Sequence, residues 1–429
     1  MRILLASLNA DGAWFVWLLN HQGHQVDWTV GNDDCRHVLE GLIPTPLDHL
    51  DPAAYDLVVF DMSGNGADAD EVRKVTPVIG ASALADKLEH DREFGLEFME
   101  RAGIPVPPWQ VFDDVADGIR YVRKVKKRVV FKPCGEGDDS SCTYVAKSPE
   151  DMERYLEVLF KRIHVKRFVM QEFIAGTEVS TEAWFNGEEW FALNHTLEEK
   201  KFMSGGIGPN TGCAGNLCWM PLRSNSLFER GLMRAAPLLK EAGFVGMLDL
   251  NTIVTEGNLF GLEWTPRFGY EGTCNLTRLL PMDFGDFLYA MAAGGSPVLG
   301  PAKHPFAATI RLSVPPYPTN GNLMKVAPSE KQFAGIPVSG LDPDSLECWY
   351  VCDMRLVPGS ENELEMISKD GLVGAPIGVG DSVEQAFKEC QIAIDKLLIP
   401  DLQYRNDVAR CCSNRYETLL SQGWLRTTG

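Results

Sequence analysis

The sequence predicts a multidomain protein of mixed α/β and α+β architecture, and three observations lead to this prediction. The chain has 429 residues, which is too many for one simple core and favours two to four domains. Short apolar strands alternate with helical stretches over residues 1–76, as in a small parallel α/β unit. Beyond about residue 300 the pattern becomes β-rich. We therefore expect an N-terminal parallel domain over 1–76, a middle domain over 77–300 and a β-rich C-terminal domain over 301–429.

Composition and charge narrow the class of protein. Hydrophobic residues make up 45% and charged residues 23% of the chain, as in soluble globular proteins. The net charge of -19 argues against non-specific binding of nucleic acid or of an anionic membrane, although a few local cations can still hold a small anion. No run of 18 apolar residues exists, and the N-terminus shows no signal-peptide pattern. We expect a cytoplasmic monomer or homodimer with no membrane partner, and its eleven scattered cysteines to be free thiols.

The N-terminal region is predicted to contain strands over 2–6, 26–30 and 57–60, with an apolar helix over 13–21. The turn Asn9-Ala10-Asp11-Gly12 follows the first strand, where such folds often bind phosphate at a helix N-terminus. This turn has a single glycine and contains an acid. A plain strand-to-helix turn is therefore the preferred interpretation.

The middle region begins with a predicted helix over 83–102, which stops at Gly103. An apolar strand over 128–133 then delivers Lys132 at its end, before an acidic loop over 134–141. A short strand near 143–145, a helix over 149–162 and a strand over 167–172 follow. Together they predict a β-loop-β-α-β module within residues 111–172.

Two strands with a turn at Gly187 are expected over 177–195, followed by a long loop over 198–215 that is rich in Gly, Asn and Thr. Such a long irregular loop is more often functional than decorative. A helix over 227–242 comes next. In the C-terminal region the final element is expected to be a helix over 382–398.

A predicted hairpin carries the strongest site signal. Its strands span 245–254 and 259–264, and Asp249 and Glu263 lie on opposite strands, with Arg267 four residues beyond. Two acids on paired strands can hold a divalent cation through carboxylate oxygens, and a guanidinium suits an anionic substrate. The alternative is a solvated hairpin with ordinary surface acids.

In this order the segments resemble the ATP-grasp ligases, and within them the glycinamide ribonucleotide synthetases (phosphoribosylamine–glycine ligases). Residues 88–92 with 101–105 resemble the helix that carries a nucleotide-contacting lysine, whose place Arg92 takes, and 129–132 resembles the strand that carries the second lysine. Residues 169–178 resemble the adenine hinge. Gly208-Pro209-Asn210-Thr211-Gly212 is identical to a family motif, and 263–269 resembles the segment with the metal glutamate and the substrate arginine.

The resemblance implies an ATP-grasp fold and an ADP-forming carboxylate–amine ligase that works through an acyl phosphate. It implies ATP and Mg²⁺ (or Mn²⁺) as cofactors, an amino acid, glycine first, as the carboxylate substrate, and an amine as the acceptor. The implied nucleotide residues are Arg92, Lys132, Gln171, Glu172, Phe173, Ile174 and Glu178. The implied substrate residues are Glu198, Lys200, Pro209, Asn210, Thr211, Gly212 and Arg267, and Lys132, Lys200 and Arg267 are the expected catalytic residues. The implied metal ligands are Asp249, Glu263 and Thr265.

Several positions depart from the family pattern. The first turn lacks the family's glycines, and the loop after Lys132 carries Glu136, Asp138 and Asp139 in place of a lysine and glycines. Thr265 stands where the family has a metal-binding Asn. Two alternatives therefore stay open: a ligase that joins an amino acid to another amine, such as a modified nucleotide, or a nucleotide-binding protein without turnover. For single residues the alternatives are surface ion pairs for Arg92 and Lys132, and a structural role for His195.

Overall fold

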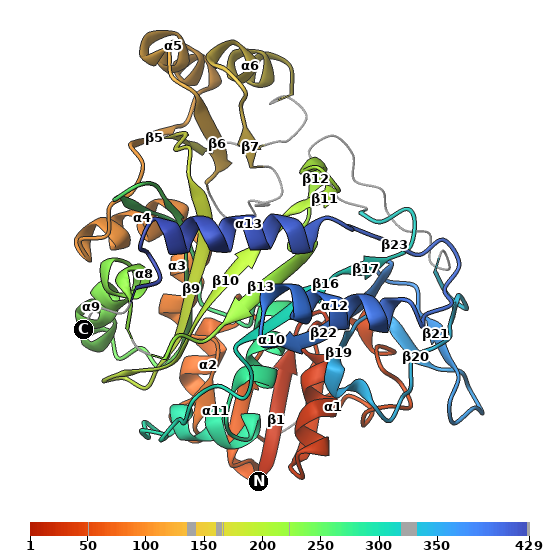
Figure 1. The fold of residues 1–429 in the computed structure, drawn as a ribbon. Coiled ribbons are helices and arrows are strands. Elements are labelled where there is room, and N and C mark those ends of the chain that lie inside the picture. The colour runs from red at the N-terminus through yellow and green to blue at the C-terminus, as the bar shows by residue number, and fades with distance from the viewer. Residues whose placement is uncertain are drawn as a thin grey trace.

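The computed structural model describes residues 1–49, 51–134, 143–159, 165, 167–222, 224–318 and 333–426. Figure 1 shows a central sheet, an N-terminal α/β layer at one end and a smaller module that stands apart at the opposite end. The acidic positions Glu136, Asp138 and Asp139 of the loop after Lys132 lie outside the described residues.

The N-terminal layer is a parallel sheet with the strand order β2-β1-β3-β4, which confirms the predicted α/β unit. Helix α1 places Trp14, Phe15 and Trp17 in the core, which fits its apolar sequence. The elements of this layer are β1 Arg2–Ser7, α1 Ala13–His21, β2 Gln25–Val30, β3 Leu57–Phe60, α2 Gly66–Val72 and β4 Val78–Ile79.

The central sheet has ten strands, and its main path runs β15-β14-β9-β10-β13-β16-β22-β17-β23, with β19 paired to β22. Its strands are β9 Thr177–Phe185, β10 Trp190–Glu198, β13 Gly215–Trp219, β14 Gly246–Val254, β15 Leu259–Thr265, β16 Phe306–Ile310, β17 Leu312–Ser313, β19 Trp349–Val351, β22 Leu372–Gly380 and β23 Gln403–Tyr404. The predicted acid-bearing hairpin is β14 and β15. Because β13 pairs with β16, the sheet continues across the expected domain boundary at residue 300.

The smaller module is a four-stranded sheet in the order β5-β8-β6-β7, and it has its own apolar core around Phe112, Phe131 and Phe168. Its elements are β5 Trp109–Phe112, α5 Val115–Val125, β6 Val129–Pro133, β7 Tyr144–Val145, α6 Pro149–Arg154 and β8 Phe168–Glu172. In Figure 1 the strands of this module reach from the central sheet towards α5 and α6. We call it the lid module.

Three predicted helices are interrupted within their expected bounds. The helix over 83–102 divides into α3 Ala83–His90 and α4 Arg92–Arg101, because Asp91 has an extended backbone and its carboxylate caps the Phe94 N–H. Helix α6 gives way after Arg154 to a π-helical turn over Tyr155–Leu159. The helix over 227–242 breaks at Gly231 into α8 Ser226–Arg230, a 3₁₀ turn Leu232–Ala235 and α9 Ala236–Glu241.

Two further expectations were wrong. The loop over 198–215 contains a small hairpin, β11 Lys201–Met203 with β12 Ile207–Asn210. The predicted final helix is α12 Val383–Ile394, and it is followed by a second helix, α13 Val408–Ser421, which packs against β9, β10 and β13. The remaining elements are α10 Glu271–Leu279, α11 Phe284–Ala292, β18 Pro337–Val338, β20 Met354–Leu356, β21 Leu364–Met366 and the 3₁₀ turns Asp33–Cys35, Pro52–Ala54 and Leu346–Cys348.

The sequence predicted no membrane span and no disulfide framework, and the described residues agree with both predictions. No helix among them is long and apolar enough to cross a membrane. The ten cysteines that fall within the described ranges are all free thiols, which confirms the expectation for those ten.

Candidate functional site

A cavity of about 860 Å³ lies between the lid module and one face of the central sheet. Its volume is within the range of pockets that enclose a small-molecule ligand. Fifteen of the predicted site residues line it: Lys132, Gln171, Glu172, Phe173, Ile174, Glu178, Glu198, Lys200, Asn210, Thr211, Gly212, Asp249, Glu263, Thr265 and Arg267. Arg92 lines a smaller adjoining cavity together with Glu263 and Arg267, and Pro209 lines neither cavity.

Lys132 enters the cavity from the end of β6. Its side chain is buried, and Nζ donates to the Leu262 carbonyl over 3.3 Å. Burial, with a smaller contribution from the charge of Arg92, lowers the pKa of Lys132 to about 8. Arg92 lies behind it, where Nε donates to the Pro133 carbonyl over 3.1 Å and a terminal nitrogen is 3.8 Å from Glu263 Oε2. Arg92 therefore supports the wall that Lys132 and Glu263 present to the cavity.

Lys200 joins two strands of the sheet floor. Its Nζ is 2.8 Å from Glu178 Oε1 on β9 and 3.4 Å from Glu263 Oε1 on β15. Although burial alone would raise it, the cations Lys200, Lys132 and Arg92 hold the pKa of Glu263 down at about 2. Glu263 is therefore ionised at every physiological pH.

The segment from Gln171 to Ile174 forms the edge of the cavity where the lid module meets the sheet. Gln171 is 1% exposed, and its Nε2 has no hydrogen-bond partner among the described residues. A buried amide donor that lacks a partner costs about 1–3 kcal/mol, so a ligand acceptor at this edge would restore the lost bond. The Glu172 carboxylate instead binds Lys127 over 2.8 Å, and the Phe173 ring packs under the Arg128 guanidinium.

Carboxylates gather at the centre of the cavity floor. Burial, then the nearby Glu182 and Glu198, raise the pKa of Asp249 well above its usual range, and burial raises the pKa of Glu182 to about 7. Glu182 accepts a hydrogen bond from Asn194, but no ion pair joins Asp249 or Glu182 to a cation within the described ranges. Thr265 pairs with Asp249 across β14 and β15. Such a cluster is chemically suited to a cation.

At the other end of the cavity the cations already have partners. Arg267 Nε binds Glu89 Oε1 over 2.9 Å, and Arg311 Nε binds Glu271 Oε1 over 2.5 Å. Tyr270, which also lines this end, has a positive φ of 43°, a conformation that non-glycine residues seldom adopt and that clusters at functional sites.

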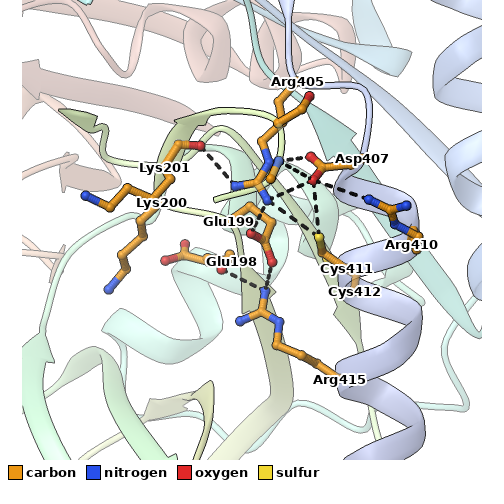
Figure 2. Close-up of polar contacts among 12 residues, drawn as sticks. Glu198, Glu199, Lys200, Lys201, Arg405, Asp407, Arg410, Cys411, Cys412 and Arg415 are labelled. Carbon is orange, nitrogen blue, oxygen red and sulfur yellow. Dashed lines mark hydrogen bonds and ion pairs between the residues drawn. The ribbon is translucent and has the colours of Figure 1, made fainter. Parts of the chain in front are cut away.

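The C-terminal helix α13 holds the segment that carries Lys200 (Figure 2). Arg415 donates to the Glu198 carbonyl over 2.8 Å and to Glu199 Oε1 over 2.6 Å, and it also reaches the Glu178 carbonyl over 3.4 Å. Arg405, just before the helix, binds Glu199 Oε2 over 2.8 Å. Two arginines from the end of the chain therefore fix the backbone next to Lys200.

The N-terminal turn is bordered by acidic side chains. Asp11 Oδ1 is 3.0 Å from Lys369 Nζ, so that cation is already paired. Asp61 is fully buried and accepts the Ser7 hydroxyl over 2.7 Å; burial raises its pKa to about 7. A Cβ at Gly12 would lie 2.4 Å from Asp61 Oδ2, so the glycine is required there for packing.

His195 is fully buried and hydrogen-bonded to Asn225 and Thr181, and burial lowers its pKa to about 3. It does not line the cavity, which agrees with leaving it out of the predicted site.

Among the cavity residues that the sequence analysis did not predict are Glu182, Asn251, Arg311 and Arg415. Asn251 could have been found, because it is two residues after Asp249 and strand alternation puts both on one face. Arg311 and Arg415 carry no such signal, since only the tertiary fold brings them to the cavity.

Comparison with known proteins agrees with this architecture. The family model for the phosphoribosylglycinamide synthetase ATP-grasp (A) domain matches residues 90–273. Phosphoribosylamine–glycine ligase of Lactococcus lactis is 23% identical over 350 residues, which is 80% of each chain. The structure of the Thermotoga maritima phosphoribosylamine–glycine ligase superposes with a TM-score of 0.70 at 20% identity, covering 95% of this chain and all of that one.

A second solved structure belongs to the biotin carboxylase domain of 2-oxoglutarate carboxylase from Hydrogenobacter thermophilus, in complex with MgADP, ADP and bicarbonate. It covers 98% of this chain and 95% of that one, with a TM-score of 0.60 at 14% identity. The chain is therefore an ATP-grasp protein related to phosphoribosylamine–glycine ligase.

Proposed function

We propose that this protein is an ATP-dependent, ADP-forming carboxylate–amine ligase. The observation that carries the proposal is the meeting of Lys132, Lys200, Asp249 and Glu263 around one cavity, between a hinge segment and a sheet. Phosphoryl transfer depends chiefly on positioning and on neutralising charge, and these residues supply both cations and metal-ligand oxygens.

ATP is proposed to lie between the lid module and the central sheet. Gln171 would present its unpartnered Nε2 at the hinge, where adenine offers matching acceptors, and Glu178 would accept hydrogen bonds from the ribose hydroxyls. Lys132 would bind the β- and γ-phosphates, and Arg92 would hold Glu263 and the backbone at Pro133 in place. The backbone of Glu172 to Ile174 completes the adenine edge.

The residues fit a divalent cation. Asp249 and Glu263 offer carboxylates and Thr265 a hydroxyl on one face of the hairpin, a donor set of hard oxygens such as Mg²⁺ and Mn²⁺ prefer. When bound, the cation neutralises charge on the transferred phosphoryl group. Asp249, which has no cationic partner in the described ranges, would gain one.

The carboxylate substrate is proposed to be an amino acid, with glycine the first to test. Arg267 would bind its carboxylate in a bidentate fork, with the rest of the substrate enclosed by Glu198, Lys200 and the segment Pro209 to Gly212. A carboxylate oxygen attacks the γ-phosphorus and ADP leaves. The amine nitrogen then attacks the acyl carbon, the C–O bond to phosphate breaks, and phosphate leaves while the nitrogen loses a proton.

A different amine acceptor from phosphoribosylamine is favoured by one observation. In the N-terminal turn Asp11 pairs with Lys369 and Asp61 is buried beside Gly12, so this turn offers no unpaired cation for a phosphate. A ligase that joins an amino acid to another amine, such as a modified nucleotide, accounts for that arrangement.

The test is to incubate the purified protein with ATP, Mg²⁺, glycine and a panel of amines, and to measure ADP and phosphate. Mass spectrometry of products formed in a metabolite extract would identify the acceptor. Lys132→Ala should abolish turnover while leaving the fold intact. Calorimetric ATP binding without ADP release in any substrate mixture would instead support a nucleotide-binding protein without turnover.

A further inference from the structure

Strand pairing places four oxygen-bearing side chains in a square on the cavity floor. Asp249 pairs with Thr265 and Asn251 pairs with Glu263 across β14 and β15. Directly opposite residues in an antiparallel pair share one face, with Cβ atoms about 4.5–5.5 Å apart. All four line the cavity. The hairpin therefore offers one more oxygen donor than the three residues that the resemblance implies.

The amide of Asn251 is held in one orientation. Its Nδ2 donates to Glu178 Oε1 over 2.9 Å, and the reversed amide would place its oxygen against that carboxylate. Asn251 is 5% exposed, and its Oδ1 has no hydrogen-bond partner among the residues that the structure describes. A buried acceptor without a partner is costly, so this oxygen is suited to a ligand that is absent here.

A water molecule can donate to this oxygen, but a cation also matches the acidic surroundings. Asn251 lies two residues after Asp249 on β14 and directly opposite Glu263 on β15, and its amide contacts Glu178. Acids outnumber cations in this region. Amide oxygens are regular ligands of hard divalent cations. The hydroxyl of Thr265 is the poorer donor of the two neutral side chains.

We propose that Asn251 supplies a neutral side-chain oxygen to the divalent-cation site, in addition to the carboxylates of Asp249 and Glu263 and the hydroxyl of Thr265. The inference rests on the proposed function, because it concerns the cation that accompanies the nucleotide. It assigns Asn251 to the metal, whereas a purely structural role would confine this residue to holding Glu178.

The experiment measures Mn²⁺ binding to the full-length protein in the presence of ADP, by electron paramagnetic resonance, and ADP binding in EDTA, by calorimetry. Asn251→Leu removes the oxygen and should raise the Mn²⁺ Kd at least about tenfold. Asn251→Asp keeps an oxygen but loses the Nδ2 donor, and its Mn²⁺ Kd should stay within about threefold of wild type. Both should bind ADP in EDTA within about threefold of wild type.

Thr252→Val is the matched control, since Thr252 follows on the same strand and its hydroxyl bonds the Val179 carbonyl. It should leave the Mn²⁺ Kd unchanged. An unchanged Mn²⁺ Kd in Asn251→Leu, or a loss of ADP binding in EDTA well beyond threefold in both variants, would overturn the inference. Failure of the wild-type protein to bind ADP at all would defeat the proposed function instead, so the two failures are distinguishable.

Discussion

The cavity floor and the N-terminal turn use the same residue types in opposite ways. On the floor, Lys132 and Lys200 face a cavity in which Asp249 and Glu182 have no cationic partner among the described residues. In the turn, Lys369 is already paired with Asp11. Asp61 accepts a hydrogen bond from Ser7 and packs closely against Gly12. On the floor two lysines face the cavity, whereas in the turn the nearby lysine is already paired with Asp11.

This difference bears on the two halves of the proposed reaction, which are the activation of the carboxylate by ATP and the capture of the acyl group by the amine. The residues proposed for the nucleotide and the cation lie mainly in the lid module and the central sheet, whereas the N-terminal turn belongs to a separate parallel sheet. The fold and the ATP chemistry therefore say little about the acceptor. The predictions below test the floor first and the turn last.

Lys132→Ala should have the largest effect, with turnover reduced by about a thousandfold or more, because it removes the buried cation proposed to face the phosphates. Steady-state ADP release measures this change. Lys124→Ala on the exposed face of α5 is the control and should retain wild-type turnover. Equal turnover in the two variants would remove Lys132 from the site.

Glu263→Gln should reduce Mg²⁺-dependent turnover by about a hundredfold, since an amide replaces a carboxylate proposed to ligate the cation. Lys200 would also lose one of its two acidic partners. A titration of rate against Mg²⁺ checks this, and the apparent affinity for Mg²⁺ should fall. A lower rate at unchanged Mg²⁺ affinity would assign Glu263 to Lys200 alone.

Arg415→Ala should reduce turnover by about tenfold, because the backbone at Glu178 and Glu198 loses its cationic clamp. Arg415→Lys should recover part of the loss. Arg410→Ala is the control, since the Arg410 side chain is 74% exposed and only approaches Asp407 at 3.9 Å. If Arg415→Ala lowers the unfolding temperature but leaves the rate unchanged, α13 serves stability and not the site.

ATP affinity should fall by about tenfold as the pH rises from 7 to 9.5. The pKa of Lys132 is lowered to about 8, so the free protein holds this lysine charged below that pH and neutral above it. Bound phosphate favours the charged form, so binding above pH 8 must recruit a proton. Calorimetry across this range tests it, and Lys132→Arg should flatten the profile because the guanidinium stays charged.

Asp11→Asn should have the smallest effect on the nucleotide, with ATP affinity within about twofold of wild type. The change leaves Lys369 with Asp353 and Asp370 at 3.7 and 3.9 Å, so we expect a loss of about 1 kcal/mol in the free energy of unfolding. Asp34→Asn, at an exposed position, is the control. A large loss of ATP affinity in Asp11→Asn would contradict the separation of floor and turn.

Much of the fold could be predicted because its signals are local. Helix α1 and strand β3 were predicted at their observed bounds, and the β14–β15 hairpin was predicted to within one residue at each end. Errors arose where a local stop signal was outweighed by helical periodicity, as at Asp91 and Gly231. Helix α13 was overlooked, although it is the longest helix in the described ranges.

The site divides in the same manner. Residues within one hairpin or one motif, such as Asp249 and Glu263, could be grouped from spacing and from resemblance. Arg311, between β16 and β17, and Arg415, on α13, lie more than 40 residues beyond that hairpin, and only the tertiary fold brings them to the cavity. The ion pairs that hold these two arginines in place, with Glu271 and with Glu199, become visible only once the fold is known.

Isotope transfer tests the proposed ligase chemistry most directly. Glycine labelled with ¹⁸O in its carboxylate would be incubated with the protein, ATP, Mg²⁺ and hydroxylamine, which captures acyl phosphates whatever the natural acceptor. If the carboxylate attacks the γ-phosphorus, inorganic phosphate should gain ¹⁸O, a glycyl hydroxamate should form, and Lys132→Ala should produce neither. ADP release with unlabelled phosphate for glycine and every other amino acid tried, or no ADP at all, would contradict the proposed ligase chemistry.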